Sequence, residues 1–270
     1  MKKNNFVIII AWGGILGIIL AASLILNDIH FNFNMLLGII LSLILIIVIV
    51  FAVALCKAIN DNRFYKRLLD NGEYDELIKL MKEKHNKLDG KMGYKQQHLA
   101  NIANCCGRMG NFQESLNYLK KIDEEGLDKY TKASYYGMYA ENLFFLNEDL
   151  MKAEELIDKS RELLDCPEAI LVKALISLEL DKKEESSELI ELYHKKTPRK
   201  KYEFTLTTVL YFDEYTEKVS GNFMLGLYYK KVGELEKAKK YFSQSAHCSY
   251  KNYFSDKGRE LYISLDNMTS

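Results

Sequence analysis

Nucleophilic or metal-assisted chemistry would need histidine, cysteine or carboxylate side chains at short, defined spacings. The five histidines of this 270-residue chain are scattered, and its five cysteines contain no Cys-x-x-Cys pair. The sequence also lacks the zinc-protease, phosphate-loop, dinucleotide-binding and nucleophile-elbow motifs (HExxH, GxxxxGK[ST], GxGxxG and GxSxG). We therefore expect a protein that is not an enzyme and needs no metal and no cofactor.

The best candidate for a reactive group is the pair of adjacent cysteines, Cys105 and Cys106. A redox pair is one interpretation. The other is that Cys106 is a small apolar residue at a packing position, because free cysteines are commonly buried. The carboxylate pair Glu154-Glu155 lies in a helical pattern and is interpreted as a solvated helix face.

A cluster of basic residues lies around a Thr-Pro pair in the second half of the chain. It is either an exposed loop or a contact for anionic lipid headgroups, which attract each nearby charge by about 1 kcal/mol. Nucleic acid is not an expected partner, because the chain has 37 basic and 37 acidic residues and no basic excess. The cluster comprises Lys195, Lys196, Arg199, Lys200 and Lys201.

Charge is distributed very unevenly between the two ends of the chain. Residues 1–56 contain only Lys2, Lys3 and Asp28 as charged side chains, whereas about a third of the remainder is charged. This contrast excludes a uniform soluble globule. It also excludes a polytopic transporter, which would spread apolar runs along its whole length.

Residues 1–56, here called the apolar head, contain two apolar runs without a charge, residues 6–26 and 35–56. At about 1.5 Å per helical residue, each covers roughly the 30 Å of a bilayer's hydrocarbon core. The eight residues between them suffice for a tight turn. The sequence therefore predicts a transmembrane helical hairpin over residues 1–56, with the lipid bilayer as a partner.

Orientation follows from the basic residues that flank the two runs, because cytoplasmic flanks are enriched in Lys and Arg. The turn between the runs has none, which predicts a multi-pass protein of an inner or plasma membrane with both termini and the remaining chain in the cytoplasm. A cleaved signal peptide is the alternative for the first run, but its apolar stretch is too long. The flanking residues are Lys2, Lys3, Lys57, Arg63, Lys66 and Arg67.

Small residues recur every four positions in both runs, a spacing that lets helix backbones approach closely. They either close the hairpin by facing one another or join two chains in a homo-oligomer. These helix-packing residues are Gly13, Gly17, Ala21, Gly38 and Ser42.

From residue 57 onward the apolar positions return at three- and four-residue steps, which indicates helices. Segments 70–77, 108–115 and 231–238 share one pattern: a glycine, a polar residue, an aromatic residue or leucine, and a small or apolar residue three further on. A helical pattern precedes and follows each glycine. The chain therefore contains a repeated helix–turn–helix unit.

This unit resembles the tetratricopeptide repeat (TPR) of about 34 residues, with the best copy carried by Gly226, Tyr229, Gly233, Ala238 and Phe242. The family's tryptophan is absent, and another α-solenoid remains the alternative. The resemblance covers most of residues 58–252 and implies an all-α fold: the transmembrane hairpin followed by a TPR-like solenoid of about five helix pairs over residues 57–270. Residues 194–218 would add an extra helix or a degenerate repeat. The units would begin near Ala58, Gln96, Ser134, Pro167 and Val219.

In TPR proteins the first helices of successive units line a groove that receives a peptide or helix of another protein. Asparagines at equivalent positions of two units could bond both N–H and C=O groups of such a ligand. The alternative is that these side chains merely pack between repeats. The groove residues that the resemblance implies are Asn104, Arg108, Tyr135, Met138, Asn142, Phe145, Leu171, Phe223 and Lys230.

These observations together predict a membrane-anchored adaptor that binds a protein or peptide partner in the cytoplasm. Two alternatives stay open: a self-assembling structural subunit, and an accessory subunit of a transport or secretion complex that uses the hairpin.

Overall fold

The computed structural model describes residues 33–86, 92–196, 214–247 and 252–269, and within these ranges it consists of helices joined by short turns, without a strand. The all-α prediction is therefore confirmed. Contacts between backbone positions divide the chain into two compact units, residues 1–60 and 61–270. Each unit is described by itself below.

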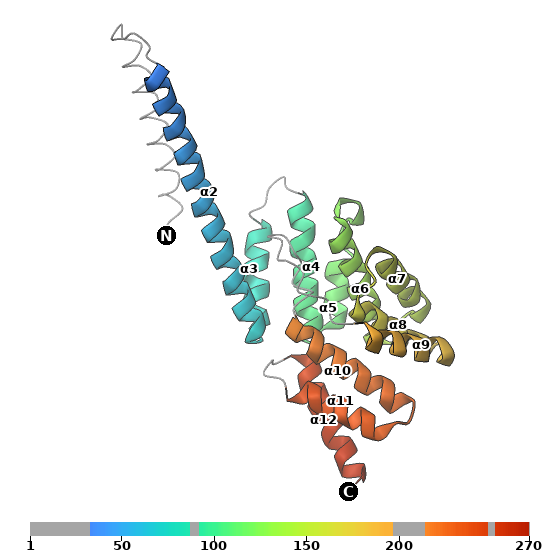
Figure 1. Ribbon diagram of the computed structural model, residues 1–270. Coiled ribbons are helices and arrows are strands. Elements are labelled where there is room, and N and C mark those ends of the chain that lie inside the picture. Colours follow the sequence, from blue (N-terminus) through green and yellow to red (C-terminus); the bar gives the residue numbers. More distant parts are fainter. Residues whose placement is uncertain (1–32, 87–91, 197–213, 248–251, 270) are drawn as a thin grey trace. The chain divides into compact units, whose positions relative to one another are not determined.

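The first described helix, α2 (Phe33–Asp70), is 38 residues long and continuous (Figure 1). No Gly or Pro interrupts the sequence between Gly38 and Gly72, which explains its length. Among the residues that the structure describes, no helix combines the length and apolar character needed to cross a membrane. The predicted hairpin is thus unsupported, and its first helix, with Gly13, Gly17 and Ala21, lies outside the described residues.

The remaining helices follow one another as helix–turn–helix pairs, which confirms the TPR-like repeats. One helix, α12, lies beyond the segment that the resemblance covers and was not predicted. The helices are α3 (Tyr74–Asn86), α4 (Met92–Arg108), α5 (Phe112–Leu119), α6 (Lys129–Leu146), α7 (Leu150–Leu163), α8 (Pro167–Glu179), α9 (Lys183–Lys195), α10 (Glu214–Lys231), α11 (Leu235–Ala246) and α12 (Tyr253–Thr269). Of the predicted extra element at 194–218, residues 197–213 lie outside the described ranges, and the rest belongs to α9 and α10.

Each turn between paired helices contains a residue with a left-handed backbone. Three of these residues are glycines, Gly72, Gly110 and Gly233, with φ of 72°, 80° and 86°. The two repeats that lack a turn glycine use Asn147 (φ 53°) and Asp181 (φ 61°), residue types that tolerate this region. The local geometry is therefore kept although the sequence pattern changes.

A buried serine on the second helix of four pairs donates a hydrogen bond to a backbone carbonyl of the first helix. A donor of this size lets two helices approach closely, and it satisfies its own polar group in doing so. The bonds are Ser115 Oγ to Ala103 O (2.7 Å), Ser160 Oγ to Ala133 O (2.8 Å), Ser186 Oγ to Ala174 O (2.7 Å) and Ser245 Oγ to Val219 O (3.0 Å).

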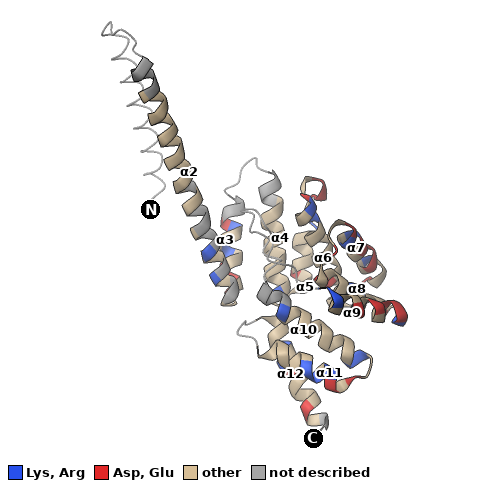
Figure 2. Ribbon diagram, viewed as in Figure 1, with Lys and Arg blue, Asp and Glu red and all other residues tan. Residues whose placement is uncertain are grey.

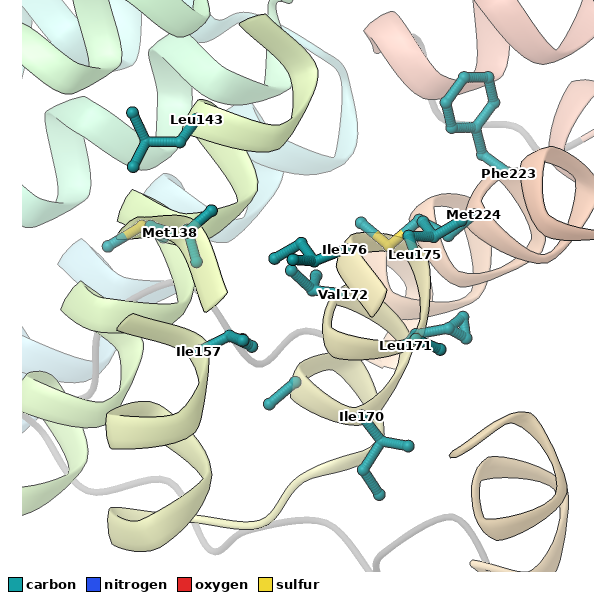
Figure 3. Packing of buried hydrophobic residues seen from close by; sticks show 14 of the residues in the cluster. Met138, Leu143, Ile157, Ile170, Leu171, Val172, Leu175, Ile176, Phe223 and Met224 are labelled. Atoms are coloured by element: carbon teal, nitrogen blue, oxygen red, sulfur yellow. The ribbon is translucent and has the colours of Figure 1, made fainter. Parts of the chain in front are cut away.

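The main core is centred on α8, where ten consecutive residues, 169–178, are buried. A helix buried all round must be covered on several sides. Figure 3 shows Val172 and Ile176 directed toward Met138 of α6, while Leu175 lies beside Met224 of α10. Helix α8 is therefore enclosed between the repeats that precede it and the C-terminal helices.

Candidate partner-binding site

Helix α4 places two polar side chains of the predicted groove on one face. Asn104 and Arg108 are one helical turn apart, and Arg108 donates from Nε to Asn104 Oδ1 at 2.9 Å. Both are buried, with 6% and 7% of their surfaces exposed. This bond uses only one of the guanidinium's five donors. Among the described residues, Arg108 forms no ion pair.

Helix α6 brings the second asparagine, Asn142, to the same region. Its Nδ2 donates to Ser115 Oγ at 2.8 Å, which extends the serine bridge between α4 and α5 into the next repeat. Burial leaves 3% of Asn142 exposed. The amide of Asn142 is therefore engaged between repeats, as the packing interpretation requires, while its Oδ1 is not used by these bonds.

Five of the nine predicted groove residues line one cavity of about 50 Å³: Asn104, Arg108, Met138, Asn142 and Leu171. Side chains of α10 and α12, among them Met224 and Phe254, close the opposite wall. This wall could not be predicted from the sequence, because the contacts between α8 and α10 join residues far apart in the chain. Five of the predicted groove residues therefore line a small, partly closed cavity, and the groove itself stays a prediction.

The other four predicted residues lie outside this cavity. Phe145 stacks on Phe112, with ring centroids 4.7 Å apart, and Phe223 is buried in the core. Tyr135 is half-buried, and burial, reinforced by Glu124 and Tyr139, raises its pKa to about 12. Lys230 is exposed on α10. The predicted set thus divides between a cavity, the core and the surface.

The basic cluster is only partly described, because Arg199, Lys200 and Lys201 lie outside the described residues. Lys195 pairs with Glu191 at 3.2 Å. Lys196 donates to the backbone oxygen of Asp165 at 2.8 Å and forms an ion pair with its carboxylate. The side chain of Lys196 therefore forms an intramolecular contact that connects the end of α9 to the residues following α7.

The interpretation of Glu154 as a solvated residue was wrong. Only 8% of it is exposed, and it accepts hydrogen bonds from Lys173 (2.9 Å) and Lys182 (2.7 Å) across α8 and α9. Burial raises the pKa of Glu154, but these two bonds outweigh it and lower that pKa below its usual value. Figure 2 shows that α7 and α9 both carry acidic segments.

The cysteine pair is buried in a second core cluster with Leu77 and Met81. Burial raises the pKa of Cys105 and of Cys106 to about 12, so both are protonated thiols at neutral pH. Protonated buried thiols are poor nucleophiles. Within the described ranges, no three His, Cys, Asp or Glu residues gather as they would around a metal ion.

Comparison with known proteins agrees with the repeat architecture. Residues 78–258 match the family described as the SusR N-terminal TPR domain. The match covers more than half of the chain, so the protein belongs to this family. No curated protein matches the sequence at a significant level. The fold and the family match together therefore identify this chain as a TPR-domain protein.

Proposed function

We propose that this protein is a non-enzymatic, membrane-anchored adaptor whose TPR domain binds a protein partner. The observation that carries the proposal is the match of residues 78–258 to a TPR family, joined to the stacked helix pairs. Stacked repeats of this kind generally act through protein–protein contacts. The absence of catalytic motifs from the sequence supports a role in binding.

Anchoring in a membrane is supported by the sequence of residues 1–56 and by the surface of α2. Large apolar side chains between Ile40 and Leu55 are exposed, with Ile47 at 67% and Phe51 at 68%. A continuous apolar surface of this kind is costly in water and is typical of contact with lipid or another protein. The basic residues that flank the two runs support a cytoplasmic position for the TPR domain.

The anchoring proposal is tested by fractionating cells that express the full chain or residues 57–270. We expect the full chain in the membrane fraction, resistant to alkaline and high-salt washes, and the shorter chain in the soluble fraction. Protease added to intact spheroplasts should leave the TPR domain uncut. A full chain released by salt would refute the anchor, and cleavage of the TPR domain would refute the orientation.

Partner binding is tested by quantitative pull-down from detergent-solubilised membranes. Tyr135 offers a half-exposed ring on α6 within the predicted groove set, whereas Tyr130 on the same helix is more exposed and lies outside that set. Under the proposal, Tyr135→Ala reduces the recovered partner and Tyr130→Ala does not. If the partner is retained equally by both variants, this part of the surface is not its binding site.

A second candidate, self-assembly through the apolar head, is favoured by one observation. A Cβ added at Gly38 would meet no atom of a described residue within 4 Å, and Ser42 on the same face is exposed, its Oγ bonded to Ile39 O at 2.8 Å. This strip is open to another helix. Gly38→Leu should then abolish cross-linked oligomers, whereas Leu41→Ala should leave them intact. Unchanged oligomers in Gly38→Leu would exclude this candidate.

A further inference from the structure

The cavity between α4, α6, α8 and α10 contains an unsatisfied polar group. The Nδ2 of Asn104 is buried and has no hydrogen-bond partner within the described part of the chain. A buried donor without a partner costs about 1–3 kcal/mol, so native structures rarely retain one unless a water or ligand satisfies it. Asn104 lines the cavity, which makes the cavity the place for that acceptor.

Two opposite charges line the same cavity without being paired. Arg108 is buried and bonds only Asn104, while Glu168 of α8 is half-buried and forms no hydrogen bond or ion pair with any described residue. Arg108 and Glu168 are also not paired with each other, so their charged groups lie more than 4.0 Å apart. Arg108, with 7% of its surface exposed, is a charge removed from water without an ionic partner, which is destabilising, whereas Glu168 keeps part of its contact with water. A ligand with a negative and a positive group would give both side chains a charged partner.

The signs of the wall charges decide the class of ligand. Among the described residues that line the cavity, Arg108 supplies the only positive charge, whereas Glu141 and Glu168 supply two negative ones. A simple anion would be attracted by the guanidinium but repelled by the two carboxylates. A zwitterion satisfies both sides: its carboxylate accepts from Arg108 and Asn104, and its ammonium group donates to Glu168 and to the free Oδ1 of Asn142.

The size of the cavity restricts the ligand further. At about 10–15 Å³ for each water-sized group, about 50 Å³ holds roughly three to five such groups, and because the cavity is only partly closed, one further group can extend into its opening. The rest of the wall includes the apolar side chains of Met138, Leu171 and Met224, together with the hydroxyl-bearing residues Ser115, Tyr193 and Ser220. From the charges, the unsatisfied amide and this volume, we infer that the cavity is a binding site for a small α-amino acid of the size of glycine or alanine. The inference concerns a ligand site separate from any protein partner and does not rest on the adaptor role.

The test uses full-length protein in deuterated detergent and saturation-transfer NMR with four probes: glycine, alanine, acetate and methylammonium. Glycine and alanine should bind, while acetate and methylammonium, which each carry one charge, should bind on the order of tenfold more weakly or not at all. Phenylalanine, which exceeds the cavity, should not bind. Binding of acetate as tightly as glycine, or no saturation by either amino acid at millimolar concentrations, would overturn the inference.

Variants locate the site. Glu168→Gln keeps the size of the side chain and breaks no described bond, so it should fold and should weaken glycine binding on the order of tenfold. Arg108→Met, which removes the positive charge from the cavity, should also weaken glycine binding on the order of tenfold. Glu188→Gln and Lys129→Met, on exposed parts of α9 and α6, are the matched controls and should bind as the natural protein does. Undiminished binding by Glu168→Gln would place the ligand elsewhere and refute the assignment, even if Arg108→Met failed to fold.

Discussion

Replacing Gly226 of α10 by alanine sets helix propensity against packing. Propensity alone favours alanine within a helix by about 0.5–1 kcal/mol. The structure argues the opposite, because a Cβ at this position would lie 2.5 Å from Cδ1 and 2.6 Å from Cε1 of Phe242. No carbon pair tolerates such a distance, so the ring or a helix must shift.

The magnitude depends on how freely Phe242 can move. Its side chain is fully buried, and its ring packs against Phe223, with centroids 5.8 Å apart. Overpacking of this kind costs about 1–3 kcal/mol. After subtraction of the propensity gain, Gly226→Ala should destabilise the protein by about 1–2 kcal/mol. For a domain of this size, that corresponds to a fall in melting temperature of about 3–6 °C.

The assay is thermal and urea unfolding followed by circular dichroism at 222 nm, since the only tryptophan, Trp12, lies outside the TPR domain. A double-mutant cycle separates the clash from other effects. In a Phe242→Leu background the ring edge is gone, and Gly226→Ala should become neutral or stabilising, which gives a coupling of at least about 1 kcal/mol.

The matched control is Gly126→Ala, because a Cβ at Gly126 meets nothing within 4 Å. It should change stability by no more than about 0.5 kcal/mol. Two results would contradict this explanation: a higher melting temperature for Gly226→Ala, or an equal loss of stability with leucine and with phenylalanine at position 242. Either result would mean that the contact between α10 and α11 does not require glycine at position 226.

Three further predictions concern stability. Asp128 caps the N-terminus of α6, because its Oδ1 accepts hydrogen bonds from the backbone N–H of Tyr130 (2.9 Å) and of Thr131 (3.1 Å). Asp128→Ala should lower the free energy of unfolding, measured in urea, by about 1 kcal/mol, and Asp128→Asn should lower it less. The pKa of Glu154 is lowered in the folded state, so the ionised carboxylate stabilises the fold at pH values above its ordinary pKa of 4.5. This stabilisation is lost as the pH falls through the lower pKa of the folded state. Glu154→Gln should therefore reduce the change in melting temperature with pH between these two pKa values. Gly233 has a φ of 86° and open space around it, so Gly233→Ala should cost about 1 kcal/mol through backbone strain alone, and Gly233→Asn less.

The all-α fold and its paired helices could be predicted from the sequence because both depend on neighbours along the chain. Apolar residues at three- and four-residue steps define the buried face of each helix, and turn residues such as Gly110 and Gly233 mark where one helix ends. Where the glycine is missing, Asn147 supplies the same left-handed backbone, so the repeat was recognisable there too.

The candidate site was predictable only in part. The sequence showed an asparagine at equivalent positions of two consecutive repeats, and the structure places both, Asn104 and Asn142, in the lining of one cavity, because stacked repeats bring equivalent residues side by side. The same reasoning could not show that both would be buried. That outcome depends on α10, which follows almost twenty residues after α9 and packs against α8.

The sequence by itself therefore determined the helical repeat, its turns and the contrast between an apolar head and a charged body, since these are properties of local pattern and composition. Only the tertiary structure decided that five of the predicted groove residues line a small cavity, that Glu154 is buried in a charge network, and that Arg108 and Glu168 line the same cavity without forming an ion pair. The physical reason is that burial and charge pairing depend on contacts between distant segments, which neither helical periodicity nor residue type encodes.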